Sequence, residues 1–376
     1  MKYSFLVNGI PSNFDTSTLA LNIGNNNIDI TKESYDEQGR LFYKFSNLCN
    51  MHCDYCFQSQ DRTYHPVNND IIIQRLEKFE KYFGKYDSER VLFGGEPFLD
   101  NNLGFIKWLI DKTSHNYIAF TNGVFSEKLK KYILDHIDRF DGFAITIDGP
   151  EQIHNKRRKY NPGNGFKVII ENIRALSDSG LSLTIQTNID SNNINHINML
   201  LKYLETELQI SKRNIVFSLN PVLHCGDSSD ELELLKCGIN LIKKYNNIVI
   251  NINSKLLQKL ENMLFGKGIS KNRCRIGKDI VADFSTGELY TCPQAISTNI
   301  GTIKDEIDID LCRVNEYKYI NEKNNNPCLN CDLAYFCSYG CYLDRRFIDG
   351  ESCRNNVQKA LDLILNNFSV FFDIED

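Results

Sequence analysis

The sequence predicts an α/β fold, a partial (β/α)6 barrel of the TIM type followed by a small cysteine-rich domain. Two observations support this prediction. Apolar and β-branched runs alternate with amphipathic helical segments from about residue 40 to about residue 245, which is the pattern of a parallel sheet covered by helices. After residue 265 the sequence changes to short strands, turns and closely spaced cysteines. A chain of 376 residues is long enough for both units.

Six apolar runs are predicted as strands of the parallel sheet. They cover residues 41–46, 90–93, 117–121, 143–147, 182–187 and 214–219. Helices are expected after them, at residues 72–83, 103–111, 127–136, 165–179, 193–207 and 229–245. The first helix is the clearest, because its apolar residues repeat at three- and four-residue spacing and Gly84 can end it.

Four segments follow from this pattern. We expect an N-terminal strand or hairpin extension over residues 1–40, with a turn at Asp36-Glu37-Gln38-Gly39. The barrel is expected over residues 41–250. A bridging helix or linker over 251–273 leads to the cysteine-rich domain at 274–376, which closes with a helix near 355–371. One face of that helix is apolar and is expected to pack on the cysteine-rich domain. It carries Leu361, Ile364, Leu365, Phe368 and Phe372.

Composition and charge exclude several classes of protein. Lys and Arg total 43 against 48 Asp and Glu, and a net charge of −5 argues against general nucleic-acid binding. No window approaches the ~18 apolar residues of a membrane span, and the N-terminus lacks a signal-peptide pattern. We therefore expect a cytoplasmic protein without nucleic-acid or membrane partners. In that reducing compartment, 13 cysteines indicate metal or redox chemistry rather than disulfides.

Three cysteines follow the first barrel strand with C-x3-C-x2-C spacing, namely Cys49, Cys53 and Cys56. Three thiolates on one loop can hold three irons of a cubane cluster and leave the fourth iron open to a ligand. Zinc usually takes a fourth protein ligand, and His52 lacks zinc-finger spacing. The motif resembles the radical S-adenosylmethionine (SAM) family, in which the cysteines carry a 4Fe-4S cluster whose open iron binds SAM. This resemblance implies that Tyr55 packs near the adenine.

Polar motifs follow the later strands, and the carboxyl ends of parallel strands form the active-site face of such folds. The candidates are Gly94, Gly95, Glu96 and Pro97 after the second strand, Asn122 after the third, Thr146 and Asp148 after the fourth, and Asn188 after the fifth. By resemblance, the Gly-Gly-Glu-Pro motif binds the SAM amino group through Glu96. Thr146 is a candidate for contact with the SAM ribose or carboxylate, and Arg158 is a candidate for contact with the carboxylate. From the residues alone, Thr146 could equally be a strand-end hydroxyl, and Arg158 part of a solvated basic stretch.

The later cysteines resemble the SPASM domain, which binds two auxiliary 4Fe-4S clusters in related enzymes. The implied ligands are Cys328, Cys331, Cys337 and Cys353 for the outer cluster, and Cys274, Cys292 and Cys341 for the inner one. The inner cluster then has an open iron or a further ligand, with Cys225 a distant candidate. Spacing alone also allows zinc. The expected cofactors are three 4Fe-4S clusters and SAM, and Cys237 and Cys312 are expected to be small buried hydrophobes.

By resemblance, the cluster cleaves SAM to a 5'-deoxyadenosyl radical that removes a substrate hydrogen. The expected function is a peptide maturase that installs a thioether or carbon-carbon cross-link in a ribosomally made peptide. Formylglycine formation in sulfatases is an alternative, ranked lower because those relatives have an Asp after the cysteine matching Cys292, where this chain has Pro293. A small-molecule cofactor precursor is a further alternative, and a zinc-stabilised adaptor on an inactive barrel is the non-enzymatic one.

The expected partners are a precursor peptide and a reducing protein such as flavodoxin or ferredoxin. The roughly 40 residues before the first strand are too few for a winged-helix domain that grips a leader peptide. The peptide is therefore expected to be held by the barrel or by a separate leader-binding protein. No residue is identified as the substrate-specific acid or base.

Overall fold

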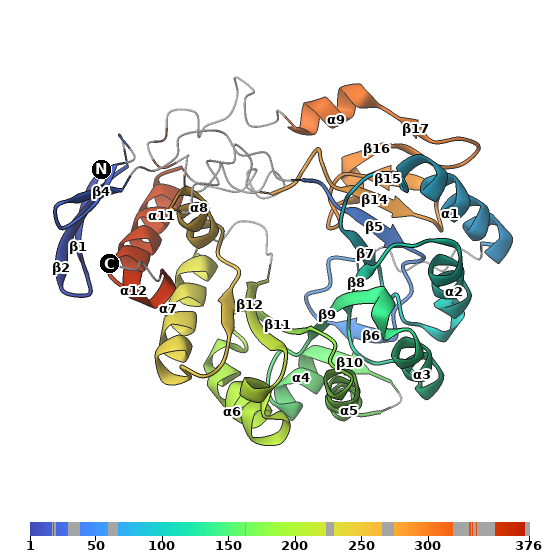
Figure 1. The fold of residues 1–376 in the computed structure, drawn as a ribbon, viewed down its shortest axis with the longest axis horizontal. Coiled ribbons are helices and arrows are strands. Elements are labelled where there is room, and N and C mark those ends of the chain that lie inside the picture. Colours follow the sequence, from blue (N-terminus) through green and yellow to red (C-terminus); the bar gives the residue numbers. More distant parts are fainter. Residues whose placement is uncertain are drawn as a thin grey trace.

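The computed structural model describes residues 1–16, 18, 20–28, 38–58, 67–161, 163–222, 229–264, 274–318 and 350–372, together with residues 331, 333 and 336. A curved sheet runs through the molecule, and helices cover its outer side (Figure 1). The prediction of an α/β fold with a parallel sheet is confirmed. None of the helices in these ranges combines the length and the apolar character needed to cross a bilayer.

In the described part of the chain, the main sheet has the strand order β13-β12-β11-β9-β8-β7-β5-β14-β15-β16-β17. Its barrel strands are β5 (Leu41–Lys44), β7 (Arg90–Phe93), β8 (Tyr117–Thr121), β9 (Phe140–Thr146), β11 (Leu183–Ile189), β12 (Ile215–Pro221) and β13 (Ile250–Ile252). Neighbours among them pair in parallel. The first six match the predicted strands. β13 is an addition, which sequence reading missed because three residues make too short a run.

The same sheet continues into the cysteine-rich segment. β14 (Ile280–Asp283) pairs in parallel with β5 on the side away from β7. An antiparallel meander follows, consisting of β15 (Glu288–Tyr290), β16 (Asn299–Thr302) and β17 (Asp308–Ile309). The two predicted domains therefore share one hydrogen-bonded sheet across the boundary that we placed between them.

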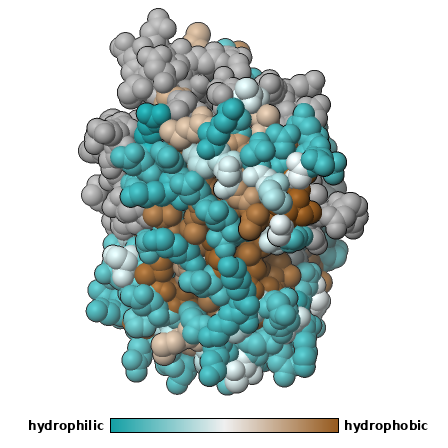
Figure 2. Space-filling view, turned by 90° about the vertical axis from the view of Figure 1, so that its left-hand side faces the viewer, coloured by the Kyte–Doolittle hydropathy of each residue, from teal (hydrophilic) through white to brown (hydrophobic). Residues whose placement is uncertain are grey.

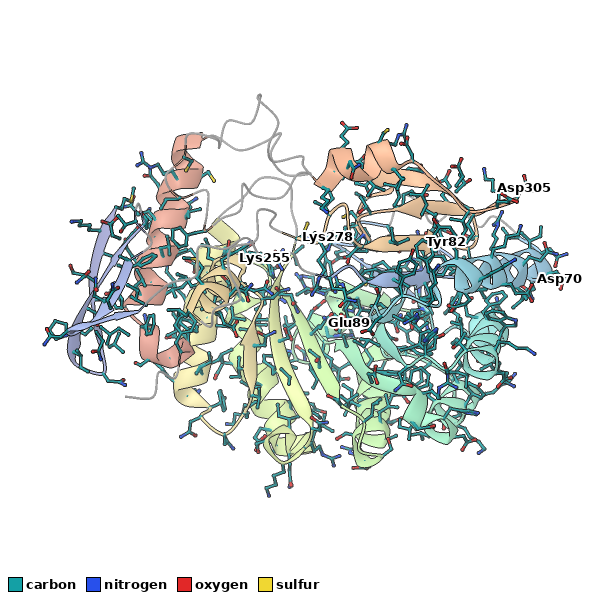
Figure 3. All side chains as sticks on the ribbon, turned by 45° about the horizontal axis from the view of Figure 1, so that its top comes forward. Asp70, Tyr82, Glu89, Lys255, Lys278 and Asp305 are labelled. Atoms are coloured by element: carbon teal, nitrogen blue, oxygen red, sulfur yellow. The ribbon has the colours of Figure 1, made fainter. Side chains whose placement is uncertain are left out.

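Helices lie between and after the strands of the sheet, and most of them bury apolar side chains. They are α1 (Asn69–Phe83), α2 (Leu103–Lys112), α3 (Glu127–Asp135), α4 (Glu151–Arg157), α5 (Gly165–Asp178), α6 (Ile197–Leu208), α7 (Ser229–Lys244), α8 (Lys255–Leu264) and α9 (Leu311–Lys318). Short 3-10 helices cover Asp100–Asn102, Ile137–Arg139, Ile194–His196, Ile210–Lys212 and Ile296–Thr298. In α1, Leu76 and Phe79 are fully buried, whereas Asp70 and Tyr82 point outward (Figure 3). This two-sided pattern is what its apolar spacing predicts.

The N-terminal segment forms a separate antiparallel sheet in the order β1-β2-β3-β4. Its strands are β1 (Lys2–Val7), β2 (Ile10–Asp15), β3 (Ala20–Ile23) and β4 (Asn26–Ile28). β1 and β2 are joined by Asn8-Gly9, whose φ angles of 49° and 85° are those of a type I′ hairpin turn. The predicted turn at 36–39 lies partly outside the described residues.

The chain closes with α11 (Gly350–Leu365) and α12 (Phe368–Phe371), which lie beside the N-terminal sheet (Figure 1). The apolar face predicted for this helix is buried throughout. It packs on α7, α8 and β1, and the Phe5 and Phe368 rings lie 5.7 Å apart. The described contacts of this face are therefore with the N-terminal sheet and with α7 and α8, and its packing on the cysteine-rich domain stays a prediction.

Candidate functional site

The cysteine loop, which we define as residues 45–58, leaves the carboxyl end of β5 and carries Cys49, Cys53 and Cys56. All three thiols are half-buried and form no disulfide. Burial raises the pKa of the Cys53 thiol to about 11. The loop thus presents three thiols at the rim where the other strand-end motifs also lie.

A two-stranded ribbon holds the cysteine loop. β6 (Met51–Cys53) pairs antiparallel with β10 (Arg158–Tyr160), so that Cys53 lies opposite Arg158. The Asp54 amide also donates to the Arg157 carbonyl at 2.9 Å. Sequence reasoning missed this ribbon, because each strand has only three residues and the partners are about a hundred positions apart.

The Gly-Gly-Glu-Pro motif lies directly against the start of the cysteine loop. The Gly95 amide donates to the Ser46 carbonyl at 3.2 Å, and the Glu96 amide donates to the Leu48 carbonyl at 2.8 Å. A Cβ atom on Gly95 would come within 2.1 Å of the Leu48 carbonyl oxygen. Only glycine allows the two backbones to approach this closely.

Glu96 is 2% exposed and faces donors of the protein itself. Its carboxylate accepts hydrogen bonds from the Thr121 hydroxyl at 2.6 Å and the Asn122 amide at 2.7 Å, and from the Phe98 amide at 3.0 Å. Burial raises the pKa of Glu96 to about 7. Glu96 thereby joins the loops that follow β7 and β8, and the predicted contact with a SAM amino group stays a prediction.

Asn122 connects this group to the cysteines. Its side-chain amide donates to Asn50 Oδ1 at 2.7 Å and lies 3.6 Å from Cys49 Sγ. The neighbouring Pro97 is buried, and its carbonyl accepts from Asn102 Nδ2 at 3.2 Å. Together with the bonds of Glu96, these hydrogen bonds connect the loops that follow β5, β7 and β8.

A second network surrounds the Tyr55 hydroxyl. It donates to the Asp148 carboxylate and accepts from Arg158 at 2.6 Å and from Asn188 Nδ2 at 3.0 Å. The Arg157 guanidinium lies 5.1 Å from the centre of the Tyr55 ring. Burial raises the pKa of both Tyr55 and Asp148. Arg158 is only 6% exposed, so the alternative of a solvated basic stretch is wrong for this residue.

Residues that sequence reasoning did not single out complete this network. The Asp148 amide donates to Nδ1 of His154, which is fully buried, and burial lowers the His154 pKa. Asn193 Nδ2 donates to the Asp148 carbonyl at 2.8 Å. Arg157 binds both carboxylate oxygens of Asp190, at 2.9 and 3.0 Å. The sequence contains no spacing that would predict these partners.

Thr146 is half-buried at the carboxyl end of β9, where it pairs with Gln186 of β11. This position places its hydroxyl on a strand of the same rim, two residues before Asp148. The predicted contact of Thr146 with SAM stays a prediction.

The later cysteines are described in part. Cys274 is exposed, and Cys292, Cys331 and Cys353 are half-buried. The other candidate ligands lie outside the described residues, namely Cys225, Cys328, Cys337 and Cys341. Within the described ranges, no three His, Cys, Asp or Glu side chains converge closely enough for one metal ion.

The two other cysteines do not share one environment. Cys237 of α7 is half-buried, and burial raises its pKa to about 11. Cys312 is exposed, so the expectation that it is a buried hydrophobe is wrong. The reason is its position on α9, none of whose residues is buried.

Comparison with known proteins identifies this arrangement. Residues 43–204 match the family model of the radical SAM superfamily. That stretch contains the cysteine loop and every strand-end motif described above. The chain carries a radical SAM domain. This domain marks the protein as an enzyme, and members of the superfamily use a 4Fe-4S cluster and SAM.

Two curated proteins illustrate the similarity outside this domain. The cysteine-type anaerobic sulfatase-maturating enzyme of Clostridium perfringens is 24% identical over 370 residues, covering 87% of this chain and 93% of that protein. An uncharacterized protein of Methanocaldococcus jannaschii is 25% identical over 296 residues, covering 74% of this chain and 93% of that protein.

Solved structures share the fold of this chain. Native anSMEcpe with bound AdoMet superposes with a TM-score of 0.68 at 20% identity, covering 88% of this chain and 96% of that chain. Streptococcus suis SuiB bound to the precursor peptide SuiA superposes with a TM-score of 0.58 at 15% identity, covering 84% of this chain and 75% of that chain. The similarity therefore extends over most of the chain.

The donor set of the radical SAM domain fits a cluster with a bound ligand. Three thiols lie on one loop, and the glycine backbone of residues 94–95 lies against that loop without a side chain between them. Asn47 Oδ1 is buried in the cysteine loop and has no hydrogen-bond partner among the described residues. A buried acceptor of this kind is suited to a donor on a ligand.

Proposed function

We propose that the protein is a peptide maturase that removes a hydrogen from a ribosomally made peptide and installs an oxidative cross-link, either a thioether or a carbon-carbon bond. The observation that carries the proposal is the hydrogen-bonded contact between the cysteine loop and the Gly-Gly-Glu-Pro motif at the rim of the barrel. A peptide substrate is supported by the solved structures of SuiB with a precursor peptide and of anSMEcpe with the Kp18Cys peptide.

In this proposal, Cys49, Cys53 and Cys56 hold the first 4Fe-4S cluster. With SAM bound, that cluster supplies a 5'-deoxyadenosyl radical able to remove an unactivated hydrogen. Glu96 and Asn122 fix the loops around the cysteines through the bonds described above. The network of Tyr55, Asp148, Arg158 and Asn188 holds the other side of the rim. The protein thus contributes positioning and exclusion of water, while the cofactor supplies the reactive species.

The proposal includes two auxiliary 4Fe-4S clusters in the segment 274–376, with the cysteine ligands implied by the SPASM resemblance. It also includes a flavodoxin or ferredoxin as electron donor, and a peptide that is held either by the barrel or by a separate leader-binding protein. Three clusters predict roughly 12 irons per chain. Iron analysis of the anaerobically reconstituted enzyme tests this number, and roughly four irons would overturn the auxiliary clusters.

Formylglycine formation in a sulfatase is the second candidate. It is favoured by the sulfatase-maturating relative of Clostridium perfringens, which matches over 93% of its own length. It is disfavoured by Pro293, which follows Cys292 and has no ionisable group to act as a base. The two candidates differ in the product that they leave on a peptide, so one experiment separates them.

The experiment incubates the reconstituted enzyme anaerobically with SAM, a reductant and two synthetic peptides. One peptide is encoded beside the gene, and the other is a sulfatase peptide with cysteine at the modified position. Loss of two hydrogens shared by one residue pair, located by tandem mass spectrometry, supports the cross-link. A cysteine that exchanges its sulfur for an aldehyde oxygen supports formylglycine. Abundant 5'-deoxyadenosine with both peptides unchanged overturns both candidates, and Cys56→Ala is the inactive control.

A further inference from the structure

A groove lies between β1 and α11, at a distance in the fold from the cysteine loop. Residues 1–5 form one wall, and Gln358, Asp362, Leu365 and Asn366 form the other. The cavity measures about 400 Å³, within the range of ligand sites. The surrounding face of the molecule is mainly hydrophilic, with hydrophobic residues across its middle (Figure 2). Leu6 of β1 is 60% exposed on the N-terminal sheet.

Within the described part of the chain, the outer edge of β1 carries backbone hydrogen-bonding groups that no strand pairs with. β1 is the first strand of its sheet, and no other described strand pairs with its outer edge. The Pro11 carbonyl accepts a hydrogen bond from the Gly24 amide, so the backbone carbonyl of Pro11 points away from β1. Backbone groups alternate in direction along a strand, so the amide and carbonyl of the next residue, Ser12, point toward β1. Phe5, opposite Ser12, therefore directs its amide and carbonyl to β2. One residue away, Ser4 directs these groups to the open edge.

The helical wall of the groove is polar and acidic. Asp362 is half-buried, and its carboxylate has no hydrogen bond or ion pair with a described residue. Burial raises the Asp362 pKa. Gln358 and Asn366 add side-chain amides on the same wall. The wall of residues 1–5 carries Lys2 and the Met1 amino group, so Asp362 is the acidic group that a basic side chain of a bound chain would face. The backbone groups of such a chain are complementary to the open edge of β1.

We propose that the groove binds an extended segment of the substrate peptide, which adds as a strand to the edge of β1 and places a Lys or Arg side chain against Asp362. An extended peptide that pairs with a free strand edge, next to a helix, obtains affinity from main-chain hydrogen bonds and specificity from side-chain contacts. This inference rests on the proposed peptide-maturase function. The groove holds a docking segment of the peptide, separate from the residues that are modified.

The decisive variant is Ser4→Pro, which removes the amide that faces the groove. Proline is tolerated on the outer edge of a sheet, and the Ser4 amide makes no bond to β2. The matched control, Ser4→Ala, changes the same side chain and keeps the amide. Binding is measured by fluorescence anisotropy with a fluorescein-labelled synthetic peptide encoded beside the gene. We expect Ser4→Pro to raise Kd at least about tenfold and Ser4→Ala to leave it within about twofold.

A second pair of variants tests the groove without touching the strand. Gln358→Trp fills the cavity from α11, whereas Lys359→Trp places the same side chain on the exposed face of that helix. We expect only Gln358→Trp to weaken binding. Asp362→Asn should weaken a peptide with Lys or Arg in the docking segment and leave its alanine-substituted version unchanged. Circular dichroism and thermal unfolding establish that each variant is folded.

The outcomes separate this inference from the proposed function. Modification of a short peptide that lacks the docking segment should be equal in wild type and Ser4→Pro, whereas KM for the full peptide should rise in the variant. Equal Kd values for wild type, Ser4→Pro and Gln358→Trp would overturn the docking site, even if mass spectrometry shows a cross-link. Failure of every labelled peptide to bind wild type would also overturn it, whatever the yield of 5'-deoxyadenosine.

Discussion

At the scale of single residues, Glu96 couples the site to pH. Its pKa is raised by burial to about 7 in the folded chain, against 4.5 for an ordinary Glu side chain. Between these values the folded state binds the proton more strongly, so the contribution of Glu96 to the free energy of unfolding falls as pH rises from about 4.5 to about 7. Glu96→Gln should remove this contribution. Urea unfolding of the metal-free protein at about pH 5 and about pH 8 should show a smaller pH difference for the variant. An equal pH difference for wild type and Glu96→Gln would show that Glu96 is not the source of this pH dependence.

Tyr55 is the second residue whose loss should be measurable. Tyr55→Phe removes the hydroxyl shared by Asp148, Arg158 and Asn188 and leaves buried polar groups without a partner. We expect the free energy of unfolding to fall by about 1–3 kcal/mol. Tyr160→Phe, on the adjacent strand β10, is the control. Urea unfolding should show a smaller loss in the free energy of unfolding for this substitution than for Tyr55→Phe. An equal cost for the two substitutions would mean that the network adds nothing to stability.

At the scale of elements, the close approach of the Gly-Gly-Glu-Pro loop and the cysteine loop is the feature to test. Gly95→Ala places a Cβ 2.1 Å from the Leu48 carbonyl and must move one loop. Gly104→Ala, on α2, meets no atom within 4 Å and is the matched control. We expect Gly95→Ala to lower iron content and to slow 5'-deoxyadenosine formation at least about tenfold. A tenfold effect corresponds to about 1.4 kcal/mol of free energy. Gly104→Ala should behave as wild type, and a Gly95→Ala enzyme with full iron content would refute the packing argument.

At the scale of the whole molecule, the two ends of the chain support each other. Phe5 is 6% exposed and packs on Phe368, whereas Leu6 points to the other face of β1. Phe5→Ala should lower the free energy of unfolding by about 3–5 kcal/mol, and Leu6→Ala by less than about 0.5 kcal/mol. Urea unfolding measures both. The rim of the barrel is built from other strands, so 5'-deoxyadenosine formation without peptide should stay within about twofold in folded Phe5→Ala enzyme. A selective loss of that activity would contradict the separation of the two regions.

The sequence by itself determined the elements whose information is local. Residues 90–93 and 117–121 are strands as predicted, because a strand buried on both faces reads as an apolar run. The spacing of Cys49, Cys53 and Cys56 on one loop is likewise a local property. It was enough to predict the radical SAM family, and the family comparison confirms it.

Only the tertiary structure decided which distant segments meet. The pairing of β6 with β10, the burial of Arg158 and the junction of β14 with β5 each join residues more than a hundred positions apart. The apolar face of α11 was readable from its spacing, but its partner was not, because any apolar surface satisfies the hydrophobic effect. Contacts of this kind depend on the path of the whole chain, since no local residue pattern states which two surfaces will be neighbours.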